Sequence, residues 1–265
     1  MLNRAAKEKA IHAFFFLTAS TSILVLGLIM LFLFTEGLPI MKIASFKEFI
    51  LGKFWYPTAD EPQFGILSMI VASMAVTVLS SMLAIPLGVM SAIFLSEIAS
   101  NKLRNIVKPV VELLAALPSV VIGFFGMVVF APFLLTSLEP FGVIRGLNLF
   151  NASIMLAFMA VPTITSISED AIYSVPRELK EASLALGATQ WETILRVILP
   201  ASLPGITTAV ILGMSRSIGE TMVVLMVAGG AAQIPDSLFD SVRPMPASIA
   251  AEMGEAPFRG DHYHA

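Results

Sequence analysis

The chain has 265 residues, of which 57% are hydrophobic and 13% are charged, and its formal net charge is −3. Together with a mean hydropathy of +0.86, this composition is typical of a membrane protein and argues against a separate soluble catalytic domain. The small net charge gives no large basic surface, so we expect no nucleic-acid partner, and the absence of cysteine excludes disulfides and thiolate metal sites.

Five apolar runs are long enough to cross a bilayer, because about 20 helical residues span its hydrocarbon core of roughly 30 Å. They cover residues 13–35, 62–96, 113–138, 146–168 and about 203–228. The first run is longer than the apolar centre of a signal peptide, so we expect a retained helix. The fifth run alone carries charges in its interior, Arg216 and Glu220.

The loops between these runs differ in their content of lysine and arginine. Nine of these residues precede the first run or lie between runs two and three and runs four and five: Arg4, Lys7, Lys9, Lys102, Arg104, Lys108, Arg177, Lys180 and Arg196. Six lie on the other side: Lys42, Lys47, Lys53, Arg145, Arg243 and Arg259. This bias predicts a cytoplasmic N-terminus, with Trp55 and Tyr56 at the outer lipid interface. Glu112, Glu169 and Asp170 fall near cytoplasmic span ends, where we expect them to be solvated or to line a gate.

The polar segment 176–200, between the fourth and fifth runs, predicts two short helices that meet at a turn. Pro176 suits the first turn of a helix, and Leu179, Ala182, Ser183 and Leu186 then share one face. Gly187 breaks this helix, and Trp191, Ile194, Leu195 and Ile198 repeat the spacing before Pro200 is expected to stop the second helix. Composition alone is equally compatible with two helices that lie flat on the membrane surface.

The same segment resembles the cytoplasmic loop signature of permease subunits of ATP-binding-cassette (ABC) importers. The resemblance rests on Glu181-Ala182-Ser183, then Gly187, then Val-Ile-Leu-Pro ending at Leu199-Pro200. Ser183 and Val197 replace the more usual alanine and isoleucine. The resemblance implies an ATPase-coupling loop over residues 176–200 that docks on a separate ATPase subunit, with Glu181, Ala182, Ser183, Gly187, Leu199 and Pro200 as its signature residues.

Three further stretches are similar to the bacterial phosphate-specific (Pst) permeases, and more to their C-type than to their A-type subunit. They cover residues 114–126, 215–222 and 250–256. This resemblance implies an all-α, type I ABC importer permease (MetI-like) bundle in the bacterial inner membrane. It also implies three kinds of protein partner: a paralogous A-type permease, a dimer of ATP-binding subunits and a periplasmic phosphate-binding protein.

The resemblance divides the chain into an N-terminal transmembrane helix with an external loop, residues 1–61, and a permease domain, residues 62–265. The family has six spans, whereas five apolar runs are found here. The sequence ends at residues 262–265, where the sixth span should begin. We therefore expect a domain truncated before helix six.

Arg216 and Glu220 are the candidate substrate-pathway residues. An unpaired arginine near the centre of a span costs at least roughly 2.5 to 3.5 kcal/mol, so an offsetting interaction is expected. Glu220 lies one helical turn further on and could form a structural ion pair with Arg216. Alternatively, Arg216 presents its planar guanidinium to a passing oxyanion such as phosphate, and Glu220 moderates the binding.

No feature of the sequence indicates catalysis. It lacks a Gly-x-x-x-x-Gly-Lys-Ser/Thr nucleotide-binding loop, so ATP hydrolysis is expected on a separate subunit. His262 and His264 have no third ligand nearby, and we predict neither a metal site nor a cofactor. Three classes of function stay open: half of an ATP-driven importer for phosphate or another oxyanion, an ion-coupled carrier that uses Arg216 and Glu220, and a scaffold without transport.

Overall fold

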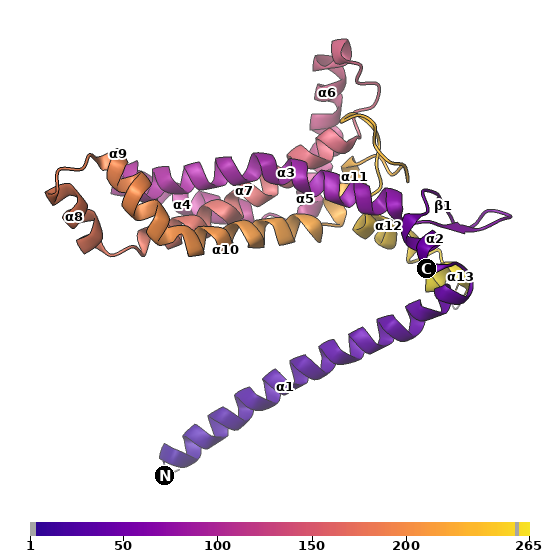
Figure 1. Cartoon of the computed structure of the whole chain (residues 1–265), viewed down its shortest axis with the longest axis horizontal. Coiled ribbons are helices and arrows are strands. Elements are labelled where there is room, and N and C mark those ends of the chain that lie inside the picture. Colours follow the sequence, from indigo (N-terminus) through magenta and orange to yellow (C-terminus); the bar gives the residue numbers. More distant parts are fainter. Residues whose placement is uncertain (1–3, 258–259) are drawn as a thin grey trace.

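The computed structural model describes residues 4–257 and 260–265, so Arg259 of the charge count lies outside the described residues. Helices α3, α7 and α10 lie side by side and form the body of the molecule, as Figure 1 shows. Helices α8 and α9 cap one end of this body, here called the hairpin end. Helices α11 and α12 and strand β1 lie towards the opposite, far end, from which α1 extends away.

The long helices are joined by shorter helices and by one two-stranded antiparallel sheet within the described residues. The α-helices are α1 (Arg4–Gly37), α2 (Phe46–Leu51), α3 (Leu67–Ile93), α4 (Asn101–Ala115), α5 (Ser119–Phe125), α6 (Ala131–Ser137), α7 (Leu149–Tyr173), α8 (Arg177–Ala185), α9 (Gln190–Thr193), α10 (Leu199–Ile218), α11 (Met222–Val227), α12 (Met245–Glu252) and α13 (Asp261–His264). The 3₁₀ helices are η1 (Leu38–Lys42) and η4 (Glu139–Phe141), and the π-helical turns are η2 (Phe94–Ile98), η3 (Gly126–Phe130) and η5 (Ile194–Ile198). The strands are β1 (Trp55–Tyr56) and β2 (Gln63–Phe64), in which Trp55 pairs with Phe64.

Five helical segments of the described chain are long and apolar enough to cross a membrane, which confirms the predicted number. They cover Ala6–Lys42, Leu67–Ile98, Ser119–Ser137, Leu149–Tyr173 and Gln190–Ile218. The third begins later than predicted because the chain breaks between Ala115 and Pro118, and Pro118 becomes the N-cap of α5. The fifth begins and ends earlier than predicted, because the helix runs on from α9 and stops at Gly219.

Helices α3, α7 and α10 approach closely because glycines face the side chain of Ile164 on α7. A Cβ atom at Gly88 of α3 would lie 2.7 Å from Ile164 Cγ2, and one at Gly213 of α10 would lie 2.6 Å from Ile164 Cγ1. Thr165 also donates a hydrogen bond of 3.2 Å to the carbonyl of Gly88. Four small polar residues of α3 are also buried, as is common where membrane helices pack closely: Ser68, Thr77, Ser80 and Ser81.

Pro200 does not stop a helix, contrary to the sequence prediction. It lies in the first turn of α10, directly after the π-helical turn η5. A proline inside an α-helix removes one backbone hydrogen bond and clashes with the carbonyl four residues earlier. The wider π turn accommodates that loss, because its hydrogen bonds skip one residue more. The segment from Gln190 to Ile218 is therefore one continuous helical rod.

The far end is held together around the carboxylate of Glu252. One oxygen accepts from Trp55 Nε1 and from His262 Nε2, each at 2.8 Å, and the other pairs with Arg243 Nη1 at 2.5 Å. Trp55 is only 9% exposed, so the prediction that it anchors at the lipid interface is wrong. Burial in a polar cluster satisfies its indole N–H instead.

Candidate functional site

Arg216 lies in the last turn of α10, and its guanidinium reaches across to two other helices. Nη1 donates to the carbonyl of Ala115 and to Oγ1 of Thr163, each at 3.2 Å. Ala115 is the last residue of α4, and Thr163 lies near the middle of α7. Arg216 therefore sits at the end of its own helix, not near the centre of its span as predicted, yet at mid-length of the neighbouring α7.

Glu220 lies beyond the end of α10 and serves a different element. Its Oε1 accepts from the backbone amides of Met222 and Val223, at 3.1 and 3.2 Å, and so caps the start of α11. Among the described residues, no ion pair joins Arg216 to a carboxylate. The predicted pair of Arg216 and Glu220 is absent because Gly219 breaks the helix between them, and the positive charge of Arg216 meets only neutral acceptors.

Segment 176–200, which we call the helical hairpin, has the predicted turn between two helices. Gly187 adopts a φ of +87°, the left-handed conformation that favours glycine. Thr189 and Glu192 form a capping box that starts α9. The hydroxyls of Ser183 and Thr193 are 2.9 Å apart and join the two helices. Ser183 therefore fixes the crossing of the hairpin from within.

The apolar side chains of the hairpin divide into a buried and an exposed group. Ile194 and Ile198 are each 2% exposed and pack with Ile172 and Ile206 in the core beside α7 and α10. Leu186, Trp191 and Leu195 are exposed instead, Leu186 at 90%. The predicted shared face of the second helix is thus wrong in detail, because the π turn rotates its residues apart. The exposed group leaves an apolar surface at the tip.

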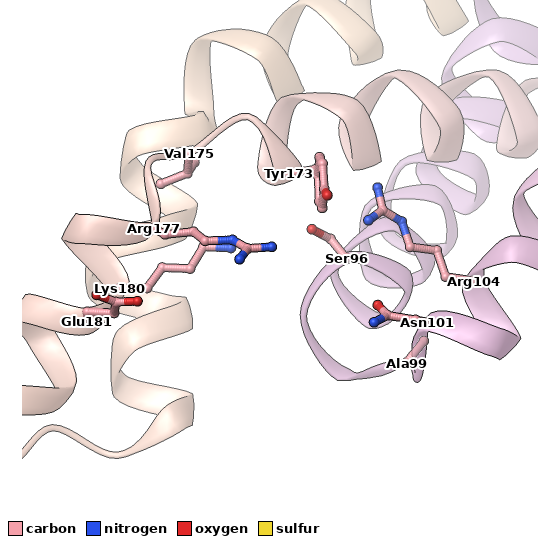
Figure 2. Close-up of a pocket in the computed structure, with 9 residues that line it drawn as sticks. All are labelled: Ser96, Ala99, Asn101, Arg104, Tyr173, Val175, Arg177, Lys180 and Glu181. Carbon is pink, nitrogen blue, oxygen red and sulfur yellow. The ribbon is translucent and has the colours of Figure 1, made fainter.

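The remaining signature residues of the hairpin lie on its surface or in its helical continuation. Glu181 and Ala182 are exposed on α8, whereas Leu199 and Pro200 open α10. Polar contacts tie α8 and α9 to η2: Lys180 pairs with Glu97 at 2.5 Å, and Gln190 donates to the Glu97 carbonyl at 3.3 Å. Figure 2 shows the Lys180 side chain reaching from α8 towards this part of the body.

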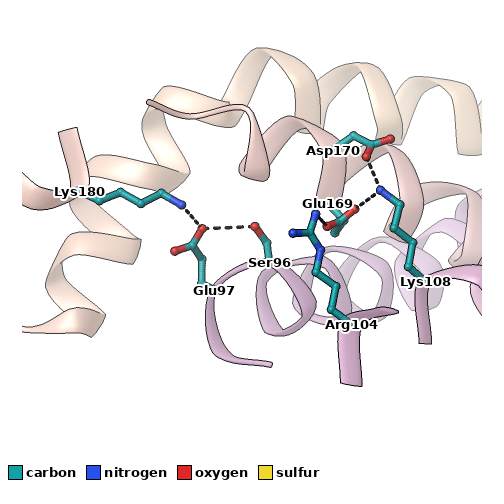
Figure 3. A network of polar contacts seen from close by, with 7 residues as sticks. All are labelled: Ser96, Glu97, Arg104, Lys108, Glu169, Asp170 and Lys180. Atoms are coloured by element: carbon teal, nitrogen blue, oxygen red, sulfur yellow. Dashed lines mark hydrogen bonds and ion pairs between the residues drawn. The ribbon is translucent and has the colours of Figure 1, made fainter. Parts of the chain in front are cut away.

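An ionic cluster centred on the buried carboxylate of Glu169 lies next to the hairpin and was not predicted (Figure 3). Glu169 of α7 is 1% exposed and pairs with Arg104 and with Lys108 of α4, the latter at 2.6 Å. Lys108 also pairs with Asp170 at 2.5 Å. Burial alone would lower the pKa of Lys108, but its hydrogen bonds to Asp170 and Glu169 outweigh this and raise the pKa above its ordinary value.

Glu169 is therefore not solvated, whereas Asp170 is 65% exposed; a gate-lining role for either residue stays a prediction. Arg104 additionally lies over the ring of Tyr173, with its Cζ 3.8 Å from the ring centroid. A signal for this cluster exists in the sequence. Arg104 and Lys108 are spaced one helical turn apart, so they share a face that can meet an acidic pair such as Glu169-Asp170.

Residues 84–251 match the family model described as "Binding-protein-dependent transport system inner membrane component". The probable ABC transporter permease protein YqgH of Bacillus subtilis is 44% identical, over 80% of this chain and 67% of that protein. The phosphate transport system permease protein PstC of Mesorhizobium japonicum is 35% identical, over 98% of this chain and 83% of that protein. The PstC of Haemophilus influenzae is 34% identical, over 79% and 71%.

Two solved structures share the fold. A bacterial ABC transporter that imports the acidic polysaccharide alginate gives a TM-score of 0.62 at 19% identity, covering 97% of this chain and 90% of that one. The inward-facing MetNI methionine ABC transporter gives a TM-score of 0.57 at 22% identity, covering 75% and 86%. At these identities the likeness concerns the fold, and it confirms the predicted all-α bundle of the MetI-like type.

Proposed function

This chain belongs to the family of binding-protein-dependent transport system inner membrane components, and we propose that it is the C-type permease subunit of an ATP-driven phosphate importer. Relatives named PstC, at 34 and 35% identity, support phosphate as the substrate. The five apolar helices support a multi-pass membrane protein that forms one half of a translocation pathway. The proposed mechanism has two parts, an arginine in the pathway and a hairpin that receives the ATPase.

The observation that carries the proposal is the uncompensated charge of Arg216 at mid-length of α7. A guanidinium has five N–H donors, and towards the described residues only Nη1 donates, to Ala115 and Thr163. The remaining donors are available to a tetrahedral oxyanion, which the planar fork matches in a bidentate manner. Glu220 is occupied in capping α11, so it does not compete with the anion for Arg216.

The helical hairpin is the proposed contact with a separate ATP-binding subunit. Its exposed apolar tip, with Leu186 and Trp191, suits burial in a groove of that partner, and Gly187 holds the turn that presents it. In this arrangement the hairpin end and the N-terminus face the cytoplasm. The far end then meets a periplasmic phosphate-binding protein, and a paralogous A-type permease completes the pathway.

Phosphate uptake by assembled complexes tests the role of Arg216. We expect Arg216→Lys to lower uptake at least about tenfold, because one ammonium keeps the charge but loses the planar fork. The double change Arg216→Met with Glu220→Met should leave an assembled complex that does not transport, since no cation then meets the anion. Arg145→Lys, an exposed cation in the loop before α7, is the matched control and should transport normally.

Assembly is measured separately, by co-purification of the partner subunits, so that a folding defect is not read as lost transport. Normal uptake by the double methionine variant would show that Arg216 is architectural and would remove the basis of the proposal. Equal uptake of sulfate and phosphate by the unmodified complex would move the proposal to a general oxyanion permease. Uptake that persists without any ATP-binding subunit would favour an ion-coupled carrier.

A further inference from the structure

A pocket of about 410 Å³ lies at the hairpin end, between α8 and the ends of η2, α4 and α7. Its volume falls within the range of roughly 300 to 1,000 Å³ that is usual for small-ligand sites. Figure 2 shows that Arg177 and Lys180 enter it from α8, while Arg104, Asn101 and Tyr173 line it from the body. The pocket is therefore shared between the hairpin and the transmembrane helices.

The lining of this pocket has more cationic than anionic side chains. Arg104, Arg177 and Lys180 supply three cations, and Glu181 is the one carboxylate in the lining. Arg104 and Lys180 are already paired, with Glu169 and Glu97 respectively.

In contrast, the side chain of Arg177 makes no hydrogen bond or ion pair with any described residue, and the side-chain amide of Asn101 and the hydroxyl of Tyr173 make no hydrogen bond with one either. The pocket is thus lined by a guanidinium, an amide and a phenol whose donors have no partner among the described residues. All three can donate to an oxyanion.

Two helix ends add to the positive character of the pocket. Asn101 is the first residue of α4 and Arg177 is the first residue of α8, so both N-termini open at this site. The N-cap of α8 is Pro176, which provides no side-chain acceptor for the first amides. Helix N-termini carry unpaired N–H groups and a partial positive charge, which favour a bound anion.

We propose that this pocket binds a phosphate group, which bridges Arg177 and Lys180 of α8 to Asn101, Tyr173 and Arg104 of the body. A phosphate has enough acceptor oxygens to engage donors on both sides, and arginine meets it in a bidentate manner. The group comes either from free inorganic phosphate or from the headgroup of an anionic lipid, since basic pockets at the cytoplasmic ends of transmembrane helices can bind such headgroups. Occupancy fixes the hairpin against the body.

The site is separate from Arg216 and does not depend on the substrate of the pathway. Because the chain has no native cysteine, a single Ala99→Cys change places one thiol in the lining of the pocket. The full chain is reconstituted in lipid nanodiscs, and the rate of modification by a water-soluble maleimide is measured. A bound anion slows this rate, by about fivefold when the free ligand is about four times its Kd.

Two arms separate the sources of the phosphate group. In phosphatidylcholine discs, inorganic phosphate is compared with chloride at equal ionic strength. In discs that contain phosphatidylglycerol, no free phosphate is added. Slowing by phosphate alone identifies the free anion, and slowing by phosphatidylglycerol identifies the headgroup. Either result supports the proposal, and the absence of slowing in both arms overturns it.

Substitutions test whether the slower modification arises from an anion bound in the pocket. Arg177→Gln should weaken protection about tenfold or more in Kd, because it removes a charged hydrogen-bond partner. Lys102→Gln is the matched control: Lys102 is exposed on α4 next to Asn101 but does not line the pocket. Equal losses in these two variants would indicate a diffuse surface field and would refute the assignment.

If Arg177→Gln does not fold, Tyr173→Phe decides the question, since it keeps the ring beside Arg104 and deletes only the hydroxyl. It should reduce protection severalfold, and unchanged protection would count against the site. Protection and phosphate uptake are independent readouts. No protection of the unmodified chain together with normal phosphate uptake would refute the pocket without touching the pathway. Normal uptake by the Arg216→Met, Glu220→Met variant would refute the pathway role of Arg216 and leave the pocket standing.

Discussion

Replacement of Gly213 by alanine tests whether close packing against Ile164 positions Arg216. A Cβ at this position would come within 2.6 Å of Ile164 Cγ1 and 2.9 Å of Cδ1, and Ile164 is only 1% exposed. Gly27 of α1 is the matched control, since a Cβ there would meet nothing within 4 Å. Both substitutions gain the same helix propensity of about 1 kcal/mol. The difference between them is therefore the overpacking cost, about 1–3 kcal/mol.

The free energies of unfolding of the Gly213→Ala and Gly27→Ala proteins are compared. They are measured from the loss of helical circular dichroism as dodecyl sulfate is titrated into the purified protein. Ile164→Ala alone should cost about 2–5 kcal/mol through its cavity. Combined with Gly213→Ala, the new methyl group enters that cavity, so the two changes should couple favourably by at least about 1 kcal/mol. A Gly213→Ala protein as stable as Gly27→Ala, or an additive double variant, would refute the packing argument.

This packing also has a transport consequence. Gly213 precedes Arg216 by three residues on α10, and the hydrogen bond from Arg216 to Thr163 of α7 is 3.2 Å long. Pushing α10 away from α7 stretches that bond, so Gly213→Ala should lower phosphate uptake in complexes that still assemble.

Three further predictions concern the hairpin end. Gly187→Val should uncouple ATP hydrolysis from uptake, because its φ of +87° strains a β-branched residue, whereas Gly187→Asn should stay coupled; a coupled valine variant would contradict the docking model. Asn101→Cys should resist an impermeant thiol reagent added outside intact cells, and labelling there would overturn the orientation. Glu169→Gln should lower the free energy of unfolding by about 1–3 kcal/mol, because the buried carboxylate pairs with both Arg104 and Lys108. Asp170→Asn should lower it by about 0–1 kcal/mol, because Asp170 is 65% exposed; equal losses would show that burial does not decide their contributions.

The features that the sequence could predict are those that depend on local pattern. Long uncharged runs predicted five spanning helices, since the cost of charge in lipid acts on each segment separately. Gly187 predicted the turn of the hairpin, because a left-handed residue between two amphipathic stretches is a local requirement.

What the sequence did not predict depends on partners that are distant in the chain. Trp55 is buried because Glu252 accepts its N–H, 197 positions away. Arg216 and Glu220 are one turn apart in sequence, but the helix ends between them, and each finds backbone groups of another element. Pro200 was expected to end a helix, but the helix continues because the π turn just before it accommodates the hydrogen bond that proline removes. For Trp55, Arg216 and Glu220, contacts with other elements overrode a valid local rule, whereas for Pro200 a neighbouring irregularity in the helix did so.

Because the helix from Gln190 to Ile218 is unbroken, the second helix of the hairpin and Arg216 lie near opposite ends of one rigid element. From Trp191 to Arg216 the helix rises about 37 Å, at about 1.5 Å per residue. Pro200 and Pro204 lie within this helix without ending it, and Gly213 brings Ile164 of α7 against its second half, where it can act as a pivot. A tilt imposed on the tip by a moving partner therefore swings the guanidinium in the opposite direction across α7. Mechanical work done outside the membrane can thus reach the middle of the bundle without any change in fold.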